Sequence, residues 1–279
     1  MRKFKHTLLA GAVALAVSAP AAAQFNNMFF LGDSLTDAGF YGARFTVNPG
    51  LVWAQDLGQQ YGFTIKPVTQ AGTDFAQGGQ RVSQPSADTP AGAPQRPLTT
   101  QIDELLKVTP NLDPNTLYGV WIGANDLRAQ ISAILSGQIS STQAGTNMAI
   151  AAGQAAQQIA RLKAAGARYV VVLNLPDFGK TPGGQAFGPV AAAGASQLTD
   201  LFNLTLNNAL ASSGLQVMSV NVHALFNEIL ASPAAFGFTN VTSPACTTSS
   251  AITCTTNTLV SPNAGNTHVF ADDIHPTPA

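Results

Sequence analysis

Apolar and polar segments alternate along the chain in a pattern that predicts a mixed fold of strands and helices. Short apolar runs that end in glycine or a polar turn predict five strands, at 28–31, 63–66, 117–122, 169–173 and 215–222. Apolar residues at helical spacing predict helices at 48–61, 100–107, 147–165, 193–212 and 224–230. Strands that alternate with helices form a parallel sheet with helices on both faces. We therefore predict the α/β class: a single three-layer α/β/α domain with a mainly parallel five-stranded sheet.

Residues 1–23 have the pattern of a secretory signal peptide. Three basic residues precede an apolar run at 8–17, and small residues follow it at 18–23. The apolar run is too short for a membrane span. We expect cleavage before Gln24 and a mature domain at 24–279, exported to the periplasm, cell surface or exterior of a bacterium.

The charge of the mature chain bears on its partners. Removing 1–23 leaves ten basic residues against 14 acidic ones, a net charge of −4. Nucleic acids and anionic membrane surfaces attract basic proteins. The balance therefore argues against both as partners and favours a small-molecule or lipid substrate.

Two cysteines, Cys246 and Cys254, lie eight positions apart in a segment rich in serine and threonine. In an oxidising compartment we expect them to form a disulfide that closes this loop; two free thiols are the alternative. No histidine lies near them in the sequence, and we expect no metal ion.

A serine follows the first predicted strand. Gly32 ends the apolar run, and Asp33 and Ser34 come next. In α/β folds, ligands bind where parallel strands end and helices begin. The free N–H groups of a first helical turn also face any anion formed there. Ser34 is thus a candidate nucleophile; the alternative is that Asp33 or Ser34 only caps a helix.

Three histidines remain after the signal peptide. His275 has Asp272 three residues before it, close enough for the carboxylate to hold the imidazole tautomer whose Nε2 accepts a proton. Such a pair activates a serine, and the order along the chain is then Ser, Asp, His. A surface turn also explains many D-x-x-H matches. We expect His223 and His268 to be structural.

Four separated motifs together identify a family. They occur in order at 32–35 (Gly-Asp-Ser-Leu), 72–79, 123–126 (Gly-Ala-Asn-Asp) and 272–275 (Asp-Asp-Ile-His). This set resembles the GDSL, or SGNH, family of serine esterases and lipases over essentially the whole mature chain. No G-x-S-x-G pentapeptide is present, which argues against an ordinary α/β-hydrolase nucleophile elbow. The resemblance implies the SGNH-hydrolase fold, which is flavodoxin-like.

The resemblance also implies roles for individual residues. Ser34 corresponds to the nucleophile, His275 to the general base and Asp272 to the acid that orients it. An oxyanion hole is implied from the backbone N–H groups of Ser34 and Gly78 and the side-chain amide of Asn125. Such donors stabilise the charge that forms when an ester carbonyl is attacked.

Some of these assignments have alternatives. Gly79 is the other candidate for the backbone donor, and we prefer Gly78; both glycines would also suit a turn. Asn125 would also suit a strand-end turn that caps the next helix. Many relatives have Asn at the position of Asp74, so we give that side chain no donor role. Two further carboxylates are expected to hold loops through backbone hydrogen bonds: Asp33 and Asp126.

The end of the chain raises a separate question. The sequence stops four residues after His275, where relatives usually continue into a helix. The signal peptide, polar loops and late cysteine pair resemble the esterase passenger domains of bacterial autotransporters. That resemblance implies an outer-membrane β-barrel as partner if the gene continues beyond Ala279. Either the sequence is cut short or the last helix is absent.

The sequence thus predicts a secreted serine hydrolase that cleaves carboxylic esters or lipids through an acyl-enzyme, without a cofactor. The loops at 38–48, 80–98 and 234–266 carry few charges, which favours acyl esters over anionic polymers. A carbohydrate O-deacetylase is the alternative within enzymes. A surface adhesion or binding module with a relict site is the alternative outside them.

Overall fold

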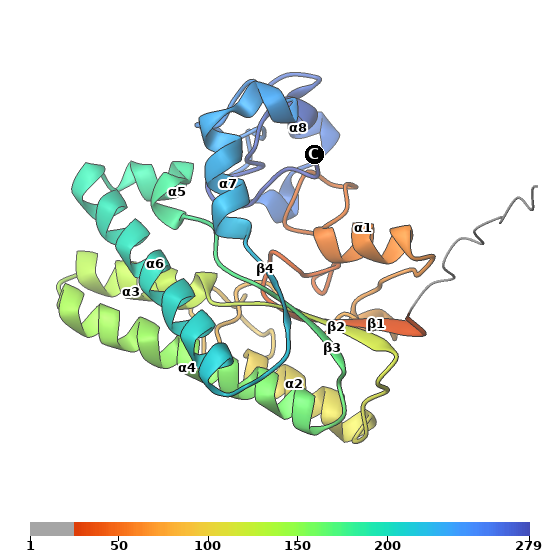
Figure 1. Ribbon diagram of the computed structural model, residues 1–279. Helices are drawn as coiled ribbons and strands as arrows, with labels where there is room; N and C mark the ends of the chain where they lie inside the picture. The colour runs from red at the N-terminus through yellow and green to blue at the C-terminus, as the bar shows by residue number, and fades with distance from the viewer. Residues whose placement is uncertain (1–24) are drawn as a thin grey trace, which may run out of the picture.

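The structure is a computed structural model that describes residues 25–279, so the expected signal peptide at 1–23 lies outside the described residues. Four parallel strands form its sheet, in chain order (Figure 1): β1 (Asn27–Gly32), β2 (Thr116–Trp121), β3 (Tyr169–Leu173) and β4 (Met218–Val220). Gly32, the last residue of β1, lies opposite Trp121, the last residue of β2. Both strands therefore end on the same side of the sheet, its carboxyl edge.

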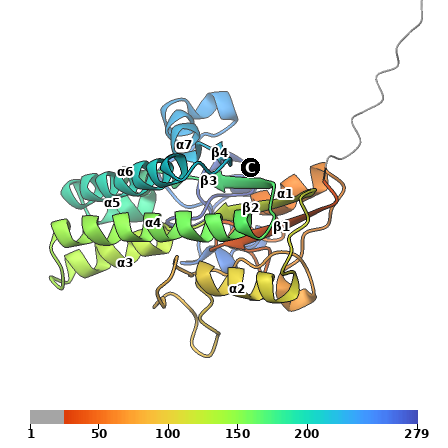
Figure 2. The same cartoon turned by 60° about the horizontal axis from the view of Figure 1, so that its bottom comes forward.

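Alternate residues of each strand point to opposite faces, and each face has its own core. In β1, Phe29 and Leu31 face the larger core, whereas Met28 and Phe30 face the smaller one. The larger core is covered by α2 (Leu98–Val108), α3 (Ala124–Leu135), α4 (Ser141–Ala164) and α6 (Pro189–Ser212). The smaller core is covered by α1 (Trp53–Gln60). Figure 2 shows α4 and α2 on the side of the sheet away from α1.

The remaining helices are short or lie at the carboxyl edge of the sheet. They are α5 (Pro182–Ala186), α7 (Val222–Ala231), α8 (Ala264–Thr267) and five 3₁₀ turns, at Val68–Gln70, Phe178–Lys180, Pro233–Phe236, Ala251–Thr253 and Thr256–Thr258. Within residues 25–279, no helix has the length and apolar character needed to cross a bilayer.

The α/β class and the parallel sheet are confirmed, but the prediction of five strands is wrong because 63–66 is not a strand. The outer edge of β1 is already occupied. Phe30 donates to the carbonyl of Thr73 (3.1 Å) and accepts from the N–H of Phe75 (2.7 Å). The segment at 63–66 instead folds back onto α1, where the Ile65 carbonyl accepts a hydrogen bond from the Gln55 side chain at 3.2 Å. Helices α3, α5 and α8 were not predicted.

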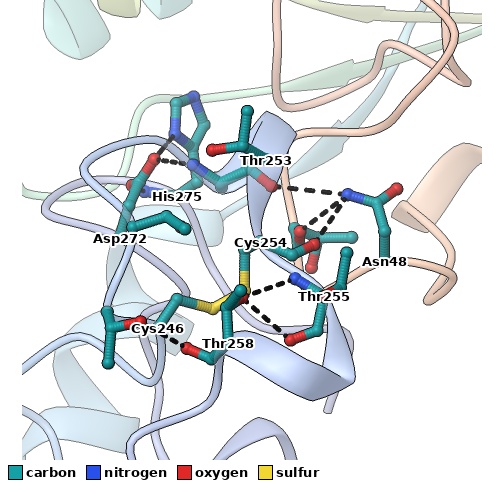
Figure 3. The surroundings of a disulfide bond; sticks show 12 residues. Asn48, Cys246, Thr253, Cys254, Thr255, Thr258, Asp272 and His275 are labelled. Carbon is teal, nitrogen blue, oxygen red and sulfur yellow. Dashed lines mark hydrogen bonds and ion pairs between the residues drawn. A yellow bond between two sulfur atoms is a disulfide. The ribbon is translucent and has the colours of Figure 1, made fainter.

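A loop closed by a disulfide packs beside the carboxyl edge of the sheet. Cys246 and Cys254 are joined, as expected, with their Cα atoms 5.9 Å apart. The Asn48 side chain, from the loop after β1, donates to the carbonyls of Ala251 (3.4 Å) and Cys254 (3.2 Å). Figure 3 shows this loop next to Asp272 and His275. The disulfide loop is thereby attached to the loop that follows the first strand.

Candidate active site

The turn after β1 places Ser34 against the end of the chain. Gly32 exchanges two hydrogen bonds of 2.8 Å with the Gln101 side chain, which fixes the end of the strand. A Cβ atom at Gly32 would lie 2.2 Å from the Trp121 carbonyl oxygen, so only glycine fits. Two residues later, the Ser34 Oγ lies 2.9 Å from His275 Nε2, although 241 positions separate them in sequence. The structure thus brings together the predicted nucleophile and the predicted base.

Asp272 holds the other side of the imidazole. Its Oδ2 lies 2.8 Å from His275 Nδ1, and its oxygens also accept backbone N–H groups from Ala251 (2.6 Å), Ile274 (2.9 Å) and His275 (2.7 Å). Burial would raise the pKa of Asp272, but the hydrogen bonds and charge of His275 and the N–H of Ile274 outweigh it and lower the pKa to about 2. The carboxylate is therefore ionised at neutral pH and favours the tautomer with a proton on Nδ1. Nε2 is then free to accept the serine proton.

The disulfide loop supports this pair. Ala251, whose N–H binds Asp272, lies between Cys246 and Cys254 in the closed loop. On the other side, the Phe45 ring lies 5.1 Å from the His275 ring, centre to centre. No pattern in the sequence indicates that either Ala251 or Phe45 contacts these residues.

The geometry of the oxyanion donors corrects one prediction. The Gly78 N–H donates to Asp37 Oδ2 at 2.8 Å, so it is not available to a substrate and the choice of Gly78 is wrong. Gly79 instead lines the same cavity as Ser34 and Asn125. Within residues 25–279, the N–H groups of Gly79 and Ser34 bind no acceptor.

Asn125, at the start of α3, has a fixed orientation. Its Nδ2 donates to the Gln80 carbonyl at 3.0 Å, which uses one of its two N–H groups. The side chain lines both cavities at Ser34, where the second N–H is left for an oxyanion. Gly79 has a φ of 81° and an added Cβ would lie 2.8 Å from the Asp88 carbonyl oxygen, which explains glycine at this position. The candidate oxyanion donors are therefore Ser34 N, Gly79 N and Asn125 Nδ2.

The expected structural carboxylates both accept backbone N–H groups, Asp33 within its own turn and Asp126 from a neighbouring loop. Asp33 Oδ1 accepts the N–H of Leu35 at 3.1 Å, and Asp126 accepts the N–H of Val82 at 2.9 Å and Arg81 Nε at 3.2 Å. Burial raises the pKa of Asp33 to about 7 and also raises that of Asp126. Asp33 Oδ2 is buried without a hydrogen-bond partner in the described part of the chain.

Two further buried carboxylates were given no structural role from the sequence. Asp37 binds the N–H of Gly78, and Asp74 binds those of Ala38 (2.6 Å) and Ala76 (2.9 Å). Burial raises the pKa of Asp37 to about 6. Burial, and then the nearby charge of Asp37, raise the pKa of Asp74 well above its usual value. Only 10% of the chain is charged, so the carboxylate of Asp37, shortly after the end of β1, was a usable signal.

The other histidines lie away from Ser34. His223 Nε2 lies 3.2 Å from Asp200 Oδ1, and His268 Nδ1 lies 3.3 Å from Thr267 Oγ1. Neither histidine lines a cavity that contains Ser34. Among residues 25–279, no group of three or more His, Cys, Asp or Glu side chains has the arrangement of a metal site.

Two cavities meet at Ser34. One, of about 340 Å³, has a mixed lining that includes the polar Asp88, Ser249, Ser250 and Asp273 and the apolar Phe45, Pro90 and Ile252. The other, of about 40 Å³, is lined mainly by apolar side chains: Leu35, Ala124, Leu127, Leu175, Pro176, Phe178 and Ile274. Ser34, Asn125 and His275 lie in the walls of both. A reacting group bound here would have one side of mixed character and one mainly apolar side.

The chain is similar to known lipolytic proteins. The family model of the GDSL-like lipases/acylhydrolases matches residues 28–279. Lipase 1 of Photorhabdus luminescens is 26% identical over 96% of the chain and 50% of its own length. An uncharacterized protein of Pseudomonas putida, from the trpE-trpG intergenic region, is 30% identical over 99% of the chain and 50% of its own length. The chain thus spans about half the length of these curated relatives.

A solved structure gives a weaker likeness. A member of the lipolytic protein G-D-S-L family from Veillonella parvula superposes with a TM-score of 0.45, at 15% identity and 90% coverage of both chains.

Proposed function

The chain belongs to the family of GDSL-like lipases and acylhydrolases, and we propose that it is a carboxylic ester hydrolase. In this proposal it is an exported serine esterase that works through an acyl-enzyme. One observation carries the mechanism. A buried serine hydroxyl lies 2.9 Å from an imidazole nitrogen whose other nitrogen is held by an ionised carboxylate. That arrangement converts a poor hydroxyl nucleophile into a good one.

The proposed reaction begins with attack by Ser34 on the ester carbonyl. The His275 Nε2 accepts the hydroxyl proton as the bond forms, and Asp272 stabilises the imidazolium through Nδ1. The carbonyl oxygen becomes an anion that receives hydrogen bonds from Ser34 N, Gly79 N and Asn125 Nδ2. Because all three donors are fixed by the fold, they need no rearrangement as the charge develops.

Collapse of this tetrahedral intermediate completes the acylation half of the reaction. The carbonyl re-forms, the bond to the alcohol oxygen breaks, and His275 returns its proton to that oxygen. The acyl group is then an ester of Ser34. Water repeats the sequence with His275 as base, which releases the carboxylic acid and restores the serine.

Export is the second part of the proposal. Its support is the charged, then apolar, then small-residue pattern of residues 1–23 and a disulfide that suits an oxidising compartment. Expression of the full chain in a bacterium, followed by mass spectrometry of the exported protein, should give an N-terminus at or within two residues of Gln24. An unprocessed cytoplasmic protein would contradict it. The resemblance to autotransporter passenger domains stays a prediction.

Turnover of a chromogenic ester tests the catalytic proposal. We expect the purified chain to hydrolyse p-nitrophenyl butyrate and Ser34→Ala to lower kcat by about 10⁴-fold or more, with an unchanged circular dichroism spectrum. Ser213→Ala is the matched control, because its hydroxyl binds only the end of α6, and it should keep full activity. Equal turnover by Ser34→Ala, or hydrolysis of acetylated sugars without that of the butyrate, would contradict the proposal.

A further inference from the structure

The small cavity at Ser34 is separated from a much larger one by three side chains that line both, one charged and two apolar. The larger cavity has a volume of about 450 Å³ and lies between α3 and α5, with Ile131, Leu135 and Phe187 in its wall. Arg128, Phe178 and Ile274 line both cavities, and Phe178 and Ile274 are the two apolar residues among them. They therefore lie where an apolar group bound at Ser34 would pass into the larger space.

The apolar cavity is the side on which an acyl chain fits. Hydrocarbon is stabilised by apolar walls, which line the small cavity almost throughout. The second cavity at Ser34 is less apolar, with Asp88, Ser249 and Ser250 beside Phe45 and Ile252 in its wall, and suits the alcohol, which must leave towards water. We infer the side of binding from this difference in lining.

The small cavity limits the length of the acyl chain. A water-sized group needs roughly 10–15 Å³ of cavity volume. The small cavity, with about 40 Å³, therefore holds about three groups of that size. A methylene is similar in size to a water molecule. The acyl chain that fits has about two to four carbons, and a longer one requires Phe178 or Ile274 to move.

The backbones of the two apolar residues that separate the cavities, Phe178 and Ile274, are held by hydrogen bonds. The turn of Phe178 is held by Asp177, whose Oδ1 accepts the Gly179 N–H at 3.1 Å and the Ser196 hydroxyl at 2.6 Å. The Phe178 side chain is 9% exposed and belongs to the larger core. Ile274 is tied by its N–H to Asp272 at 2.9 Å. Moving either side chain would disturb a packed core or the base that acts on Ser34.

We propose that Phe178 and Ile274 divide the apolar cleft and so restrict the protein to esters of short acyl chains, acetyl to butyryl. The proposal rests on the serine esterase function and names its substrate class. It also makes the larger cavity available to longer chains once either side chain is truncated.

The test compares kcat/KM for p-nitrophenyl acetate, butyrate, octanoate and laurate. In the unmodified protein we expect octanoate to be at least about tenfold worse than butyrate. Phe178→Ala should raise the octanoate-to-butyrate ratio at least about tenfold, and Ile274→Ala should do so independently. The ratio is insensitive to a general loss of activity because that loss affects both substrates.

Phe226→Ala is the matched control. Phe226 is also 9% exposed, but it packs in a separate cluster with Phe238, Val269 and Phe270 and lines neither cavity. The Phe226→Ala variant should lose stability as Phe178→Ala does and leave the octanoate-to-butyrate ratio unchanged. If Phe178→Ala does not fold, Phe178→Leu and Ile274→Ala decide the question.

The outcomes separate two failures. Octanoate turnover equal to or better than butyrate in the unmodified protein, or ratios unmoved in folded Phe178 and Ile274 variants, would overturn the short-chain proposal and leave the esterase function intact. No turnover of any ester would overturn the function itself, and the proposal with it.

Discussion

Removal of the Asn125 amide should impair the chemical step far more than substrate binding. Asn125 Nδ2 already donates one N–H to the Gln80 carbonyl, which leaves one N–H for the oxyanion. The proposed site has three such donors, and loss of one typically raises the barrier by about 3–4 kcal/mol. For Asn125→Ala we therefore expect kcat to fall about 10²- to 10³-fold with little change in KM, because the oxyanion exists only in the transition state.

The same variant should also lose some stability, for a separate reason. The Gln80 carbonyl would lose the amide donor in a buried setting, which costs about 1–3 kcal/mol of unfolding free energy. Urea unfolding measures that loss independently of kcat. Rates must be measured where both proteins are fully folded.

Asn221→Ala is the control for loss of an asparagine. Its side chain caps α7 by accepting the Ala224 N–H at 3.0 Å and lines neither cavity at Ser34. It should lose about 1 kcal/mol of stability and no kcat. A drop in kcat of less than about tenfold for Asn125→Ala, or a loss confined to KM, would refute the assignment of Asn125 as an oxyanion donor.

Three more predictions follow from the contacts around the site. Asp272→Asn should lower kcat about 10³- to 10⁴-fold in ester turnover, because a neutral amide no longer selects the His275 tautomer; activity within tenfold would contradict this. The double variant Cys246→Ser, Cys254→Ser should lose about 2–3 kcal/mol in urea unfolding and part of its kcat, because their loop binds Asp272; unchanged values would contradict it. Asp33→Asn should remove a pH dependence of stability. Burial raises the Asp33 pKa to about 7, so between about pH 4 and pH 7 the folded state holds a proton that the unfolded state has lost, and stability falls with rising pH by about 1.4 kcal/mol per unit. Equal slopes for both proteins would contradict it.

The sequence predicted the parts of the site that depend on local pattern. A serine directly after an apolar strand and an Asp-x-x-His near the end of the chain are recognisable without coordinates, and the structure brings Ser34 and His275 to 2.9 Å. The helix at 124–135 has apolar residues at Leu127 and Ile131, four apart, which were a usable signal for α3.

The parts that failed depend on competition between segments. Both 63–66 and 73–75 can pair with β1, and only the folded chain shows that Thr73 and Phe75 take its edge. Gly78 and Gly79 are adjacent and chemically identical, so the choice between them depends on which N–H turns towards Asp37. Phe178 and Ile274 come from distant segments, and nothing local marks them as a shared wall.

The most direct test of the central claim is covalent labelling of the mature chain with a fluorophosphonate, followed by peptide mass spectrometry. An activated serine attacks this reagent, whereas ordinary hydroxyls do not. We predict a single modification, on the peptide that contains Ser34, at a rate that falls sharply in His275→Ala. Labelling of another serine, or unchanged labelling without the imidazole, would contradict the account.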